Sequence, residues 1–393
     1  MKKLVFRNGI YTVFRPLYYV CKVFGLASYS YVADSRNKRM TPHYGYWNYM
    51  FTLIWLIILT FALPVKILTL RSVDFDTQTL FIAFKLYVIF SFTSSIVAVV
   101  WVSVIKRRKF LEILECISEV DNKVQYTQQE ATYMIRNVML NIISEIIVLT
   151  ATESLIIIRK IYLIAIKPYY IIIIQTISYV PLICNAVILF QFVNLVFMMK
   201  QRFSHLNKRL TKWMSGDRAA DQVNITRLFV SNVRNIEGTL RQTDIHLLQQ
   251  IYSEMYDITC LINDTYGIPV LATMCWMLVA FIFATYETMT NTNETRVEVI
   301  ACVVAYIVLF FKVTFFCHTA TNEARSTRTV VGKLLLEENR RKECVKQLKI
   351  FSLHLQAMKN EYTSCGFFSL NLSLFTSVVS VIASCVVILV QIK

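Results

Sequence analysis

The sequence predicts an all-α polytopic membrane protein with seven transmembrane helices, a cytosolic N-terminus and an extracellular C-terminus. Of its 393 residues, 56% are hydrophobic and only 17% are charged, and the mean hydropathy is +0.51, outside the range of soluble domains. Seven apolar stretches are long enough to cross a hydrocarbon core of about 30 Å as helices. With only 8 Gly and 6 Pro, the chain has little material for flexible linkers. We therefore expect one membrane-spanning unit with extended helices.

The predicted spans are defined by low charge and sufficient length. They are Trp47–Val65, Leu80–Val104, Val138–Ile158, Ile171–Met199, Ile268–Tyr286, Val297–Phe316 and Gly366–Ile392. The chain then divides into a cytosolic N-terminal segment (1–46), transmembrane helices 1–4 (47–199), cytosolic helical extensions (200–267), transmembrane helices 5–6 (268–316), a cytosolic connection with an amphipathic helix (317–365) and transmembrane helix 7 (366–392).

Orientation follows from the distribution of Lys and Arg between the spans. The N-terminal segment and the second, fourth and sixth connections hold 8, 6, 9 and 9 of these residues. The first, third and fifth connections hold 2, 3 and 1. The positive-inside rule therefore places the N-terminus in the cytosol and the C-terminus outside. The start, MKKLVF, is similar to the basic start of a signal peptide, but Arg15 and Lys22 interrupt any apolar core, which favours a retained cytosolic segment.

Composition and motifs exclude several functions. The net charge of +16 lies mainly between apolar spans, which indicates contact with an anionic lipid bilayer and no nucleic acid. The 10 cysteines form no CxxC pair and the five histidines are scattered, so we expect no metal site and no cofactor. No Walker loop, GxSxG or HExxH motif is present. The sequence predicts no catalytic residues and no enzyme.

Two connections carry apolar residues at helical spacing. In 200–267 these residues predict helices that extend the fourth and fifth spans into the cytosol. In 317–365 the series Val345, Leu348, Phe351, Leu355 and Met358 predicts an amphipathic helix. A cytosolic bundle and a helix lying on the inner leaflet both fit this pattern.

Some ionisable residues fall deep inside the predicted spans, where each is a candidate functional residue. Lys85 in span two and Glu153 in span three both belong to the outer half, so they are expected either to form a structural ion pair or to contact a ligand. Glu145 lies on roughly the same helix face as Glu153. Lys312 is near the inner end of span six, where snorkelling to the interface accounts for it.

A ligand pocket is predicted from rings and amides in the outer halves of the spans. Gln175, Tyr179, Trp276 and Tyr306 join Lys85 and Glu153 as candidate ligand-binding residues. Tyr169, Tyr170 and Tyr286 lie near span ends and are better explained as interface anchors. Asn293 begins a glycosylation sequon in the fifth connection, on the expected outer side.

The last span carries a polar stripe. Its hydroxyls and one amide fall within an arc of roughly 100°; they are Ser369, Ser373, Thr376, Ser377, Ser380, Ser384 and Gln391. Val387 and Ile388 interrupt the stripe near its end. Small polar stripes often pack helices together, with hydroxyls bonded to their own backbone, and they also line pores with apolar constrictions.

The C-terminal 80 residues carry a distinctive set of motifs. The run 384–392 has five apolar residues between Cys385 and Gln391, and Ile392 follows. Upstream lie the pattern Gly366, Phe368, Leu370-Asn371 and Leu374-Phe375, and the segment 318–335 with Asn322-Glu323-Ala324. These motifs are similar to those of the insect gustatory and odorant receptor superfamily. Gustatory receptors typically end in Thr-Tyr, five apolar residues and Gln-Phe, so Gln391 is in place here, with Cys385 for Tyr and Ile392 for Phe.

The resemblance implies a tastant-gated nonselective cation channel, homotetrameric or heterotetrameric with related subunits, in the plasma membrane of a sensory neuron dendrite. The cytosolic helical extensions would form an anchor bundle between subunits. The final helix of each subunit would line the pore, with Ile388 and Ile392 as apolar gate rings and Gln391 as a polar ring. Ser377, Ser380, Ser384 and Val387 complete the expected pore and gate residues. The altered ending favours a bitter or plant secondary compound over a sugar. A G-protein-coupled receptor is the alternative from another class, but it requires the opposite orientation.

Overall fold

The computed structural model describes residues 14–33, 40–43, 45–70, 78–124, 126–164, 180–214, 240–290, 296–336 and 342–391. A helix over residues 14–23 precedes the labelled elements. These are β1 (Ser30–Ala33), β2 (Met40–His43), α2 (Tyr46–Leu70), α3 (Gln78–Val100), a π-helical turn (Trp101–Ile105), α4 (Lys109–Val124), α5 (Gln128–Ile164), α7 (Val180–Met214), α9 (Leu240–Thr290), α10 (Arg296–Leu335), α11 (Lys342–Ala357), β3 (Thr363–Ser364), β4 (Phe368–Ser369) and α12 (Leu372–Gln391).

Each of the seven predicted spans corresponds to a helix. In the described chain, six helices contain an apolar window long enough to cross a membrane, and α12 has a shorter one, Leu372–Ile388. The all-α polytopic membrane fold predicted from hydropathy is therefore confirmed.

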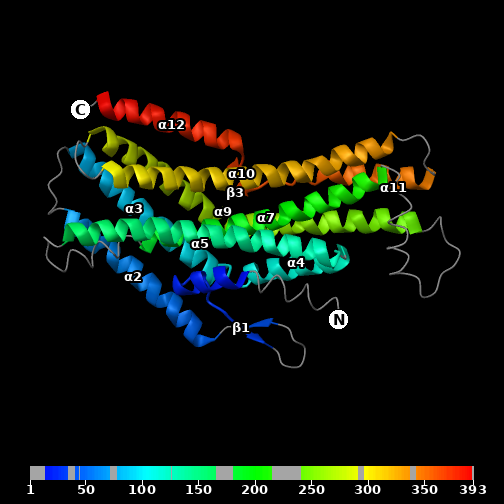
Figure 1. The fold of residues 1–393 in the computed structure, drawn as a ribbon, viewed down its shortest axis with the longest axis horizontal. Helices are drawn as coiled ribbons and strands as arrows, with labels where there is room; N and C mark the ends of the chain where they lie inside the picture. The colour runs from blue at the N-terminus through cyan, green and yellow to red at the C-terminus, as the bar shows by residue number, and fades with distance from the viewer. Residues whose placement is uncertain are drawn as a thin grey trace.

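Four described helices are much longer than a bilayer requires. α5, α7, α9 and α10 contain 37, 35, 51 and 40 residues, which at 1.5 Å per residue gives roughly 55, 52, 77 and 60 Å. They run side by side along the long axis of the molecule (Figure 1). The helical extensions predicted for 200–267 are present where the chain is described, since α7 continues to Met214 and α9 begins at Leu240. The continuation of the sixth span through 317–335 was not predicted, because that segment was treated as a connection.

Two amphipathic helices cover the extended ends of these long helices. On α11, Leu348, Phe351 and Leu355 are buried, and the helix packs against α9 and α10. Of the two arrangements expected for this amphipathic helix, the contact shows the helical bundle and not a helix lying on a membrane surface. α4 packs against α9 in the same way through an apolar face that sequence analysis overlooked; its buried members include Ile113, Leu114 and Ile117.

A capping box separates α4 from α5. The Glu130 amide donates to Thr127 Oγ1 at 3.3 Å, and the Thr127 amide donates to Glu130 Oε2 at 3.0 Å. This Thr-x-x-Glu pattern is a sequence signal for a helix start. It explains why the third apolar helix begins at Gln128, ten residues before the predicted edge of the span.

The start predicted for the last span, Gly366, is wrong. Residues 366–371 are not helical: Gly366 has φ +75° in the turn of the β3–β4 hairpin, and α12 starts at Leu372. Asn371 Oδ1 accepts a hydrogen bond from the Leu374 amide at 3.0 Å, which caps the helix. The 20 residues that remain still span roughly 30 Å.

Candidate ligand and pore sites

An aromatic cluster joins α3, α9 and α10 where a ligand pocket is predicted. Trp276 on α9 and Tyr306 on α10 meet edge to face, with ring centroids 5.3 Å apart. The hydroxyl of Tyr306 lies 3.4 Å from that of Tyr87 on α3. Tyr87 in turn stacks on Phe283 at 5.3 Å, and Phe281 contacts Tyr306 at 6.3 Å. The structure therefore brings two predicted ligand residues together and adds three rings from other positions.

Trp276 gives this cluster an unused hydrogen-bond donor. The residue is 1% exposed, and its Nε1 has no hydrogen-bond partner among the described residues. A buried indole N–H normally finds an acceptor, because leaving it unpaired costs free energy. The site consequently combines ring faces with one free donor, which suits a ligand with an acceptor atom.

The other predicted ligand residues do not join Trp276 and Tyr306, or lie outside the residues that the structure describes. Lys85 on α3 is exposed. Glu153 belongs to α5, but its side chain, like Gln175, Tyr179 and the sequon residue Asn293, lies outside the described residues. The predicted pairing of Lys85 with Glu153 stays a prediction.

Lys312 does not have the isolated, snorkelling role predicted for it. Its Nζ lies 2.7 Å from Glu145 Oε1, and the carboxyl side chain is 1% exposed. The same carboxylate accepts hydrogen bonds from the amides of Asn194 on α7 at 2.5 Å and Asn141 on α5 at 3.1 Å. An ammonium and a carboxylate within reach stabilise each other where water is scarce, so pairing was favoured over snorkelling. The two asparagines inside apolar spans were the sequence signal that we overlooked.

The polar stripe on α12 faces away from the rest of its own chain. Ser377, Ser380 and Ser384 are exposed, as are Val387, Ile388 and Gln391. The opposite face carries Leu374, Phe375, Val378 and Ile382, which pack against the core. The hydroxyls from Thr376 to Ser384 donate to carbonyls of their own helix, for example Ser384 to the Ser380 carbonyl at 3.0 Å. Ser369 was placed on the stripe but lies in β4, before α12 begins. The stripe is therefore not a packing face within the described chain. Ile392 lies outside the described residues.

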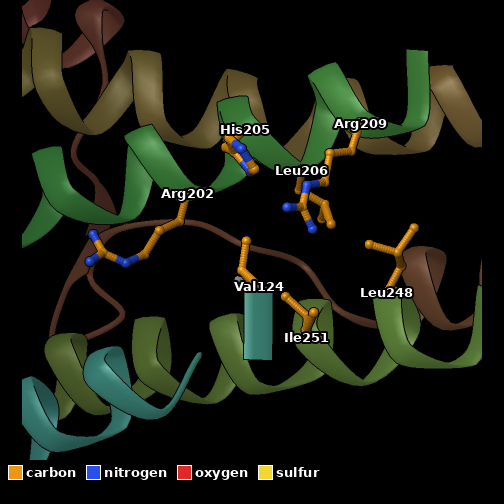
Figure 2. A pocket seen from close by; sticks show the side chains of 7 residues that line it. All are labelled: Val124, Arg202, His205, Leu206, Arg209, Leu248 and Ile251. Carbon is orange, nitrogen blue, oxygen red and sulfur yellow. The ribbon is translucent and has the colours of Figure 1, made fainter. Parts of the chain in front are cut away.

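A small pocket lies in the helical extensions and not at the predicted ligand site. Figure 2 shows side chains of α7, including His205 and Arg209, facing Leu248 and Ile251 of α9, with Val124 at the end of α4. Ile251 and Trp276 are 25 residues apart on one helix, or about 37 Å. We therefore treat this pocket as part of the bundle.

A buried ion pair lies beside that pocket. The Arg202 guanidinium donates from Nε to Asp121 Oδ1 at 2.8 Å and from Nη2 to Oδ2 at 2.5 Å. The two side chains are 4% and 1% exposed. Burial raises the pKa of Asp121 above its ordinary value, and the facing guanidinium opposes that rise. The pair fastens α4 to α7 inside the bundle.

The fold and these sites define the class of the protein. It is a multi-pass helical membrane protein with a site lined by aromatic rings and a C-terminal helix that is exposed along one face. The sequence matches the 7tm Chemosensory receptor family over residues 14–393, so the chain belongs to that family. This match confirms the resemblance seen in the C-terminal residues. It also places the chain in a family of receptors.

Solved structures of low sequence identity share the fold. The insect olfactory receptor OR5 from Machilis hrabei in complex with eugenol has a TM-score of 0.75 at 13% identity, covering 99% of this chain and 100% of that chain. A second structure of the same OR5 has a TM-score of 0.71 at 12% identity, with 98% and 99% covered. No curated protein sequence matches the chain significantly.

Proposed function

We propose that this chemosensory receptor is a ligand-gated, nonselective cation channel of the gustatory type. The observation that carries the proposal is α12, whose apolar face packs on the core while its hydroxyl stripe faces outward. Four copies arranged with these stripes inward, as a homotetramer or with related subunits, would form a polar pore that Val387, Ile388, Gln391 and Ile392 narrow at the outer end. The N-terminus would be cytosolic, and the receptor would reside in the plasma membrane of a sensory dendrite.

The aromatic cluster supports a neutral, ring-bearing ligand such as a bitter or plant secondary compound. Its rings supply contact area, and Trp276 Nε1 supplies one donor for a ligand oxygen. OR5, which has the same fold, is known in complex with eugenol, a ligand of this chemistry. A sugar is the competing ligand class, but its many hydroxyls require more polar partners than the described cluster offers.

The function is tested by recording whole-cell currents from cells that express the receptor. Eugenol, quinine and sucrose represent a plant phenol, an alkaloid and a sugar. We expect a cation current with eugenol that persists when G-protein signalling is blocked. An epitope tag after Lys393 should stain on unpermeabilised cells. Staining only after permeabilisation, or a current abolished by the block, would favour the G-protein-coupled alternative.

Trp276→Phe is expected to raise the half-maximal ligand concentration without lowering the maximal current. The substitution keeps a ring against Tyr306 but removes the Nε1 donor together with part of the indole. The donor alone is worth about 0.5–1.5 kcal/mol, or about twofold to tenfold in affinity. Dose-response curves with eugenol measure this shift. Trp55→Phe on α2, where the indole contacts Phe24 at 5.9 Å, is the matched control and should leave the curve unchanged. Equal curves for wild type and both variants would remove Trp276 from the site.

A further inference from the structure

The pair between Glu145 and Lys312 occupies the junction of three helices. The carboxylate comes from α5, the ammonium from α10, and Asn194 from α7. Asn141 also donates to Asn194 Oδ1 at 2.8 Å, so the two amides are held as well as the charges. The carboxylate thus receives three donors, and a shift of α10 against α5 and α7 has to break or exchange charge-assisted hydrogen bonds in an apolar segment.

α10 also connects the aromatic cluster with the final helix. Tyr306 contacts Trp276 and lies six residues before Lys312, about 9 Å along the helix axis. Phe310 and Phe311, directly before Lys312, contact Phe375 of α12 with ring centroids 5.9 and 5.7 Å apart. One continuous helix therefore carries the ligand-side ring, the charged group and the contact with the stripe-bearing helix.

We propose that the Glu145–Lys312 pair is a positioning device that holds α10 against α5 and α7 and so sets how readily ligand binding opens the pore. The inference rests on the proposed channel function. The pair touches neither the aromatic cluster nor the hydroxyl stripe in the described contacts, so it acts through the position of α10. It should alter the balance between closed and open states and leave the permeation path unchanged.

The test compares the wild-type pair with a neutral and a charge-exchanged form in single-channel recordings, without ligand and with eugenol. Glu145→Gln with Lys312→Met removes both charges, keeps similar volumes and leaves no lone buried charge. Glu145→Lys with Lys312→Glu exchanges the charges, and the amides of Asn141 and Asn194 can accept from a lysine as well as donate. Lys200→Met is the control, because this neighbouring cation lies over the Phe315 and Phe316 rings at 5.9 Å.

We expect the neutral variant to change the unliganded open probability or the half-maximal eugenol concentration at least tenfold, at unchanged unitary conductance. The exchanged variant should return both values to within threefold of wild type, and the control should not move them. Wild-type gating in the neutral variant, or no recovery in the exchanged one, would overturn the inference. Loss of both the neutral and the exchanged variant from the cell surface would do so too, by reducing the pair to a structural role. A wild-type protein that conducts neither alone nor with any ligand of the panel would instead contradict the proposed channel function, and this inference with it.

Discussion

Arg202→Ala is expected to cost about 3–5 kcal/mol of stability, because it leaves the Asp121 carboxylate buried without its cation. Both side chains are almost fully buried, so water cannot replace the guanidinium. The measurement is the thermal midpoint of the detergent-solubilised receptor, followed by fluorescence-detected size-exclusion chromatography. The variant should unfold at a lower temperature and give less folded receptor at the cell surface.

Two controls separate the buried charge from other effects of losing an arginine. Arg325→Ala removes a partner of Glu361, but those side chains are 64% and 37% exposed, so the expected cost is at most about 1 kcal/mol. Arg202→Met combined with Asp121→Leu removes both buried charges and should recover most of the stability. Equal losses for the Arg202 and Arg325 variants would contradict the role given to the buried pair.

Ile388→Ser is expected to raise the unliganded cation current roughly tenfold, because in the proposed tetrameric channel it replaces an apolar constriction with a small polar one in every copy. Ile388 is 54% exposed on the stripe side of α12. Currents normalised to surface receptor measure the effect. Gln391→Ala, which changes the proposed polar ring beside it, should alter ion selectivity more than the resting current.

Val379→Ser is the matched control for this gate. Val379 is also branched and exposed, at 51%, but it lies nine residues before Ile388 and so on the opposite side of the helix. It should leave the resting current unchanged. A similar rise for both variants would indicate a general weakening of α12, and no rise for Ile388→Ser would remove it from the gate.

The apolar helices could be predicted because hydropathy is a local property. A helix in lipid must satisfy its own backbone hydrogen bonds, so a long uncharged stretch has few alternatives. The same reasoning failed at Gly366, where the residues are apolar enough for a span but the chain turns through positive φ before Asn371 caps the helix. The Thr127–Glu130 capping box shows that local polar signals mark such edges better than hydropathy does.

The candidate site was only partly predictable. Trp276 and Tyr306 could be singled out as rings deep within spans, but their contact depends on how α9 packs against α10. Tyr87 and Phe283 could not be chosen over the many other rings in the sequence, since nothing local marks them as neighbours. Lys312 was assigned to the interface from its position alone, whereas its partner Glu145 is 167 residues away in the chain.

By itself, the sequence determined that this protein is a seven-helix membrane protein, through hydropathy, charge distribution and the residues of its C-terminal ending. It also determined the periodic stripe on the last helix, because helical geometry fixes which residues share a face. Only the tertiary structure decided which face of α12 packs on the core, which rings meet and that Glu145 pairs with Lys312. Those outcomes depend on contacts between distant helices, and the pattern along one helix does not specify its neighbours.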